Sequence, residues 1–251
     1  MNPLILPEHQ MVTPTPVIVA LDFDNAQSTL SFVRQLDPAL CQVKVGKELF
    51  TATGRSLVES LVNQGFKLFL DLKYHDIPNT VASACRVAAD MGVWMVDMHA
   101  CGGRRQMEAA VEAVAHFQNK PLLIGVTVLT SMDEQDAKEV GIDKPIAEQV
   151  VSLATLAQAS GLDGVVCSAQ EAVLLRQNLG NEFLLVTPGI RLPNAQGGDD
   201  QRRIMTPEQA LQAGSSYLVM GRPVTQASDP VAVIRQVNAI AAGMNAPSTA
   251  S

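Results

Sequence analysis

The sequence predicts an α/β fold, a single-domain (β/α)8 TIM barrel, and three observations support this prediction. The chain has 251 residues, a length that such barrels commonly reach as one domain. Eight short apolar or β-branched runs recur along it, each followed by a stretch with helical spacing of apolar residues. No linker rich in Pro, Gly and Ser divides the chain. We expect the barrel at 17–241, an N-terminal extension at 1–16 and a flexible C-terminal tail at 242–251.

The expected strands and helices alternate along the whole barrel region. The strands are expected at 17–21, 42–45, 67–70, 94–98, 122–128, 164–167, 183–186 and 217–220. The helices are expected at 26–36, 54–64, 80–91, 105–117, 146–160, 169–179, 207–213 and 230–241. Two connections are long and polar, at 131–145 and 191–203, and such loops are usually mobile or functional.

Composition excludes several classes of protein. The net charge of −7 and the pI near 5.1 argue against a nucleic-acid or membrane-surface protein, which usually presents clustered positive charge. The first 16 residues lack a basic segment followed by an apolar run, and no later run is apolar enough to span a membrane, so neither secretion nor membrane spanning is expected. The four cysteines stand far apart, which fits reduced thiols packed as small hydrophobes. We therefore expect a cytoplasmic protein.

The segment from Asp71 to Thr80 is the most informative part of the sequence, because it places several charged residues directly after an apolar run. Side chains alternate between the two faces of a strand, so Asp71 and Lys73 are expected to point the same way and Leu72 the other way. A carboxylate and an ammonium would then share one small site. Two interpretations stay open: a structural ion pair, or a lysine placed by carboxylates to deliver a proton.

Further candidates follow other strands, at the end of the barrel where loops build the active site. Lys44 stands between two valines, so alternation turns it into the barrel interior, where a lysine is seldom buried unpaired. Asp22 follows the first strand and Asp76 precedes Pro78, and each is either a site residue or the cap of the next helix. His99 is expected to be a scaffold group, so the catalytic candidates are Lys44, Asp71, Lys73 and Asp76.

The last two strands are followed by residues suited to a phosphate group. Gly189 and Gly221 allow close approach of the backbone, and Arg191 and Arg222 bring positive charge to a place where barrels often bind phosphate. The connection 191–203 could close over the phosphate as a lid, or be an ordinary solvated loop. The sequence contains no metal-binding or nucleotide-cofactor motif, so chemistry without metal or cofactor is expected.

Taken together and in order, these motifs resemble the orotidine 5'-phosphate decarboxylase family, in its compact bacterial form, over about 16–241. The segments that carry the resemblance are Val19-Ala20-Leu21-Asp22, Lys44-Val45-Gly46-Lys47-Glu48, residues 71–80, Val128-Leu129-Thr130-Ser131, Thr187-Pro188-Gly189-Ile190-Arg191, residues 198–203 and Val219-Met220-Gly221-Arg222-Pro223. The resemblance implies decarboxylation of orotidine 5'-phosphate to UMP and CO2 in de novo pyrimidine biosynthesis, without a cofactor.

The resemblance also implies a role for each matching residue. Asp22 and Lys44 would bind ribose hydroxyls, and Asp71 would stand beside Lys73, the proton donor. The family is a homodimer, so Asp76 and Thr80 would serve the site of the neighbouring subunit. The remaining substrate-binding residues would be Thr130 and Ser131 near the pyrimidine, and Pro188, Arg191, Gln201, Gly221 and Arg222 around the phosphate.

Two alternatives remain. A sugar-phosphate decarboxylase or aldolase on the same barrel would use a similar Asp-x-Lys-x-x-Asp motif with Mg²⁺, and full activity in chelator would argue against it. A catalytically inactive nucleotide-binding barrel would be expected to lack one of the charged residues, and none is missing.

Overall fold

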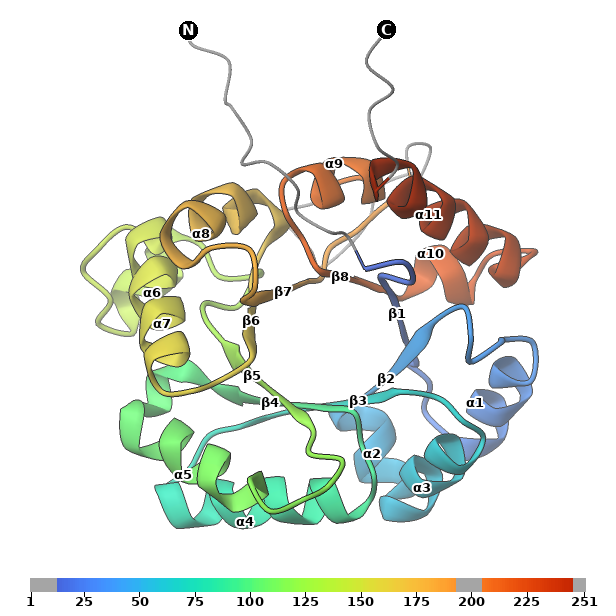
Figure 1. Cartoon of the computed structure of the whole chain (residues 1–251), viewed down its shortest axis with the longest axis horizontal. Helices are drawn as coiled ribbons and strands as arrows, with labels where there is room; N and C mark the ends of the chain where they lie inside the picture. The colour runs from blue at the N-terminus through green and yellow to red at the C-terminus, as the bar shows by residue number, and fades with distance from the viewer. Residues whose placement is uncertain (1–12, 193–204, 246–251) are drawn as a thin grey trace, which may run out of the picture.

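Eight parallel strands close into a barrel in the computed structural model, which describes residues 13–192 and 205–245 (Figure 1). Each strand pairs with the next along the chain, and β8 pairs with β1 to close the ring. The strands are β1 (Val17–Ala20), β2 (Gln42–Gly46), β3 (Leu68–Tyr74), β4 (Met95–His99), β5 (Leu122–Val126), β6 (Gly164–Val166), β7 (Leu184–Thr187) and β8 (Tyr217–Met220). The predicted single-domain (β/α)8 TIM barrel is confirmed.

Helices surround the barrel on its outside, and each predicted helical stretch overlaps one of them (Figure 1). These helices are α1 (Ala26–Val33), α3 (Arg55–Asn63), α4 (Pro78–Asp90), α5 (Arg104–Val114), α7 (Ile146–Ala159), α8 (Ala172–Leu179), α9 (Pro207–Gln212) and α11 (Pro230–Asn245). Among the described residues, three short α-helices were not predicted, namely α2 (Lys47–Thr53), α6 (Glu134–Glu139) and α10 (Arg222–Thr225).

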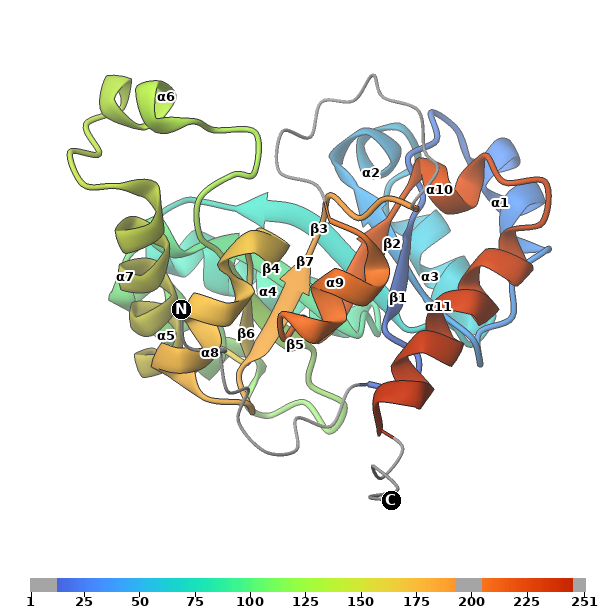
Figure 2. The same ribbon diagram turned by 90° about the horizontal axis from the view of Figure 1, so that it is seen from above.

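The connection 131–145 is not simply the polar loop that the sequence predicts, because it contains α6. The Asp133 side chain accepts hydrogen bonds from the backbone N–H groups of Gln135 and Asp136, and the Asp136 side chain accepts one from Asp133 in return. This capping box pairs N–H groups that a helix start otherwise leaves unsatisfied, so a polar sequence can still form a helix. In Figure 2, α6 stands away from the body of the barrel.

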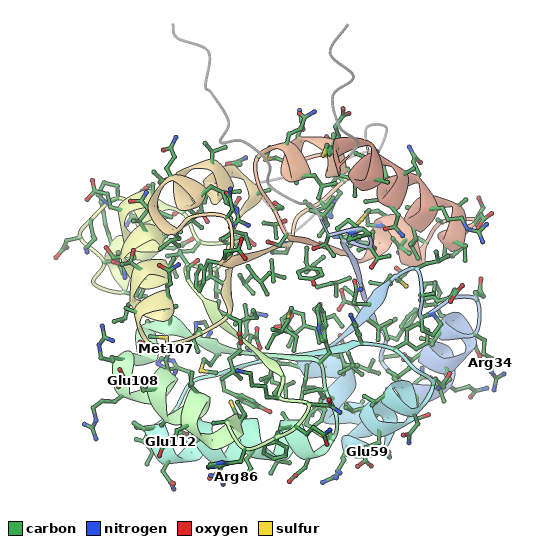
Figure 3. All side chains as sticks on the ribbon, in the orientation of Figure 1. Arg34, Glu59, Arg86, Met107, Glu108 and Glu112 are labelled. Atoms are coloured by element: carbon green, nitrogen blue, oxygen red, sulfur yellow. The ribbon has the colours of Figure 1, made fainter. Side chains whose placement is uncertain are left out.

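Alternation along the strands separates two apolar layers. Val43 and Leu70 belong to the large core between the barrel and its helices. Ile18, Phe69 and Met95 belong to a second cluster inside the barrel. Figure 3 shows side chains filling the barrel, so its interior is packed rather than a pore. The polar residues on the inward face must therefore lie beyond this apolar layer, toward the ends of the strands.

The third strand is longer than predicted. The sequence predicts a strand at 67–70 with Asp71 and Lys73 after it, but β3 continues to Tyr74. The pairing of β3 with β4 changes register between Leu70 and Tyr74, so the strand contains a bulge there. The strand can include Asp71 and Lys73 because both pair with opposite charges inside the barrel.

The cysteines are free thiols, as expected, but they are not all buried. Cys41, Cys85 and Cys167 are buried, whereas Cys101 is exposed. Burial raises the pKa of Cys41 and Cys85 to about 12. These two thiols therefore stay protonated at neutral pH and act as small apolar side chains.

The end of the barrel region differs slightly from the prediction. The last helix, α11, continues to Asn245, whereas the tail was expected from residue 242. Among residues 13–192 and 205–245, no helix is both long enough and apolar enough to cross a membrane.

Arg176 joins α8 to the strands that follow it. Its buried guanidinium donates to the carbonyl oxygens of Gly180, Phe183 and Gly214, and to the hydroxyl of Ser216. Burial lowers the pKa of this group, which is nevertheless charged at neutral pH. One side chain thus donates hydrogen bonds to several backbone carbonyl oxygens.

Arg176→Met should lower the free energy of unfolding by at least about 2 kcal/mol, because it leaves several buried carbonyl groups without a donor. Urea denaturation measures this change. The matched control is Arg55→Met, which removes an exposed helical ion pair with Glu59 and should change stability by no more than about 0.5 kcal/mol. Equal effects of the two substitutions would contradict this account of Arg176.

Candidate active site

A cavity of about 350 Å³ opens at the carboxyl ends of the strands. The predicted site residues that line it are Asp22, Lys44, Asp71, Lys73, Thr130, Ser131, Pro188, Arg191, Gly221 and Arg222. Its apolar lining comes from Ala20, Phe69, Val126, Val128, Leu129, Val166 and Val219. Barrel closure therefore brings together side chains from widely separated parts of the chain, in a volume suited to a small ligand.

Charges of opposite sign alternate along one side of the cavity. The Lys44 Nζ atom lies 3.5 Å from Asp22 Oδ1 and 3.2 Å from Asp71 Oδ2. The other oxygen of Asp71 accepts a hydrogen bond from the Lys73 ammonium. The predicted pairing of Asp71 with Lys73 on one strand face is thus present. A methyl group at Gly46 would lie 3.2 Å from Lys44 Nζ, so glycine there keeps the ammonium uncrowded.

Burial and neighbouring charges shift the pKa values of Lys44 and Asp71 in opposite directions. Burial alone would lower the pKa of Lys44, but the carboxylates of Asp71 and Asp22 outweigh it and raise that pKa above its ordinary value. Burial alone would raise the pKa of Asp71, but Lys44 and then Lys73 outweigh it and hold that pKa below its ordinary value. Both groups are therefore charged at neutral pH.

Asp97 is a buried member of this cluster that sequence reasoning missed. Its carboxylate is completely inaccessible to solvent, and its Oδ1 atom accepts a 2.8 Å hydrogen bond from the backbone N–H of Lys73. Burial, followed by repulsion from Asp71, raises its pKa well above the ordinary value. The signal was present in the sequence: Asp97 stands between two apolar residues of a strand, the pattern that placed Lys44 in the barrel interior.

The residues expected to surround a phosphate follow β7 and β8 and line the same cavity. Gly189 has a φ of 79°, in the left-handed region that glycine adopts readily. A methyl group at Gly221 would lie 3.4 Å from Asp22 Oδ2, so glycine leaves room where β1 and β8 meet. Arg191 and Arg222 line the same cavity. The expected lid at 191–203 and its residue Gln201 lie almost entirely outside the described residues.

Asp76 and Thr80 do not line the cavity of their own chain. Both side chains are exposed. The alternative of Asp76 as a helix cap is wrong, because Ile77 is the N-cap of α4 and Asp76 accepts a hydrogen bond from the Ile77 N–H. The corresponding alternative for Asp22 is also wrong, since Asn25 caps α1.

Two histidines near the site lie close to each other. The rings of His99 and His75 lie 5.4 Å apart, and burial, then the charges of His75 and Lys47, lower the pKa of His99. In the ranges 13–192 and 205–245, no three His, Cys, Asp or Glu side chains are grouped so that they could hold a metal ion.

Comparison with known proteins identifies the family. The model of the orotidine 5'-phosphate decarboxylase / HUMPS family matches residues 15–237. The chain belongs to this family. A curated orotidine 5'-phosphate decarboxylase of Neisseria meningitidis is 72% identical over 241 residues, which are 96% of this chain and 98% of the relative. One of Chromobacterium violaceum is 61% identical over 95% of this chain and 96% of the relative.

A solved structure of a family member has the same fold as this chain. The crystal structure of orotidine 5'-phosphate decarboxylase from Lactobacillus acidophilus superposes with a TM-score of 0.81 at 40% identity, covering 90% of this chain and 98% of that chain. The resemblance stated from the sequence is therefore confirmed for fold and family.

Proposed function

We propose that the chain converts orotidine 5'-phosphate to UMP and CO2 in the barrel cavity, without a cofactor, and that Lys73 protonates C6 of the pyrimidine. The observation that carries the activity is the 72% identity to a curated orotidine 5'-phosphate decarboxylase over nearly the whole of both chains. The cavity supports the assignment of roles, because the Lys44–Asp71–Lys73 cluster and two arginines line the same cavity.

The chemistry is difficult because loss of CO2 from C6 leaves a carbanion in the plane of the ring, where the π system cannot delocalise it. Enzymes lower barriers by about 8–23 kcal/mol, and this reaction requires the upper part of that range. Asp71 is held ionised by its lysines, so it repels the substrate carboxylate beside it. At about 4 Å and an effective dielectric near 20 this repulsion amounts to about 4 kcal/mol, so it is one contribution among several.

Lys73 acts where the negative charge develops. Its ammonium stabilises the forming carbanion, donates a proton to C6, and leaves UMP as the product. Lys44 and Asp22 bind the ribose hydroxyls on the other side of Asp71. Thr130 and Ser131 lie near the pyrimidine.

The phosphate group supplies binding energy far from the reacting carbon. In this proposal Pro188, Arg191, Gly221 and Arg222 bind it, together with Gln201, which lies outside the described residues. Capture of the phosphate then holds the ring in the reactive alignment.

A homodimer completes the site in this proposal. Asp76 and Thr80 lie outside the cavity of their own chain, at the start of α4, where a partner can receive them. Thr80 shares one helical face with Val87, and both Ile77 and Val87 are exposed at 67% and 49%. Exposed apolar side chains beside two polar candidates are suited to a subunit interface. We also propose a cytoplasmic location, which cell fractionation would test.

One assay tests the activity. Purified protein is mixed with orotidine 5'-phosphate, and the ultraviolet absorbance is followed with and without EDTA while UMP is identified by chromatography. UMP formation at the same rate in EDTA is expected. No UMP would overturn the proposal, and activity that depends on added Mg²⁺ would favour the sugar-phosphate alternative.

Arg222→Ala should weaken the binding of UMP about 10- to 100-fold, because a charged hydrogen-bond donor to phosphate is lost. Isothermal titration with UMP measures the effect. Uridine lacks the phosphate and serves as the control, since parent and variant should bind it equally. If Arg222→Ala binds UMP as tightly as the parent, the phosphate site is misplaced.

A further inference from the structure

The bulge in β3 leaves one residue of β4 opposite several residues of β3. The register pairs Leu70 with Val96 and then Tyr74 with Met98. Between these pairs, β3 contains the segment 71–73, whereas β4 contains Asp97 alone. The backbone of β4 therefore cannot form hydrogen bonds with every backbone N–H and C=O group of that segment.

The side chain of Asp97 provides the acceptor that the ladder lacks. Its Oδ1 atom accepts the hydrogen bond from the backbone N–H of Lys73 at 2.8 Å. Lys73 has a φ of 50°, and no other non-glycine residue in 13–192 and 205–245 has a positive φ. A side chain with a Cβ atom disfavours this left-handed conformation, so it persists where surrounding contacts hold it.

The backbone at Lys73 decides where its ammonium points. In this conformation, the Lys73 side chain contacts Asp71 and lines the cavity, and its Nζ atom lies 3.9 Å from Asp97 Oδ2. Asp97 is completely buried, so water cannot replace its carboxylate as acceptor. The same carboxylate thus lies next to both the backbone and the ammonium of this lysine.

We propose that Asp97 is a positioning residue, which holds the Lys73 backbone in its left-handed conformation and so aims the ammonium at the reacting carbon. This inference rests on the proposed role of Lys73 as proton donor. Bulges next to active sites commonly re-aim a side chain in this way. In this proposal Asp97 acts through Lys73 and not on the substrate.

Two substitutions distinguish the effect of losing the Lys73 N–H···Asp97 hydrogen bond from the effect of losing the Asp97 charge. Asp97→Ala removes the acceptor, and kcat should fall about 100-fold because a small misplacement of a reacting group has an effect of that size. Asp97→Asn keeps an oxygen that can accept from the Lys73 N–H, so kcat should stay within about tenfold of the parent. The dissociation constant of UMP should change less than about threefold in both variants, because the loss lies in the chemical step.

The matched control is Asp163→Ala. Asp163 also accepts a backbone N–H of a strand through its carboxylate, since Leu123 N lies 2.8 Å from Asp163 Oδ2, but it does not line the cavity. Loss of stability in urea is expected for this control, with kcat unchanged. Should Asp97→Ala fail to fold, Asp97→Leu, which fills a similar volume without an acceptor, takes its place in the comparison.

Lys73→Ala, measured in parallel, separates failure of this inference from failure of the proposed mechanism. An inactive Lys73→Ala together with parental kcat in Asp97→Ala would overturn the role of Asp97 alone. An Asp97→Asn variant as impaired as Asp97→Ala would also overturn it, as would an equal loss of kcat in Asp163→Ala. A fully active Lys73→Ala would overturn both proposals.

Discussion

Lys73→Ala is expected to lose turnover while keeping its affinity for UMP. Removing a general acid typically lowers a rate by about 10²–10⁴-fold, and Lys73 also stabilises the carbanion, so the loss should reach at least the upper value. Stopped-flow or long-incubation assays of UMP formation measure kcat, and isothermal titration measures the binding of UMP. Substantial residual decarboxylation would exclude Lys73 as the proton donor.

The folded site should survive this substitution, which makes the test specific. Lys44 also holds the pKa of Asp71 low, and its Nζ atom lies 3.2 Å from Asp71 Oδ2. Asp71 is therefore still paired when Lys73 is removed. Lys120→Ala, at an exposed lysine just before β5, is the control and should retain parental kcat.

Mixing inactive Lys73→Ala chains with inactive Asp76→Ala chains is expected to restore activity. If each site combines Lys73 of one subunit with Asp76 of the other, a heterodimer contains one intact site and one site with both defects. With random exchange in a two-fold symmetric dimer, about a quarter of all sites should be intact. Activity is measured after exchange of subunits, which differently tagged chains can verify.

The control for this experiment mixes Lys73→Ala with Asp71→Ala. Both residues line the cavity of the same chain, so every site of every dimer carries a defect and no activity should return. No recovery with Asp76→Ala, despite verified exchange, would show that Asp76 does not cross the interface.

Much of the fold follows from local patterns in the sequence. The eight apolar runs and the helical stretches between them predicted the barrel, and alternation predicted that Lys44 faces inward and that Asp71 and Lys73 point the same way. The same rule would have found Asp97 had it been applied to β4. The segment at α6 was missed because its polar residues resemble a loop, although Asp133 and Asp136 have the spacing of a capping box.

The sequence by itself therefore determined the barrel, the family resemblance and the inward direction of Lys44, because alternation and helical spacing are properties of neighbouring residues. Only the tertiary structure decided that β3 continues through Asp71 and Lys73 with a bulge, and that Asp97 supplies the missing acceptor. Lys73 and Asp97 are 24 residues apart, and their contact exists only once β3 and β4 pair. No local pattern encodes such a register shift, since it depends on which buried partners the closed barrel places beside each charge.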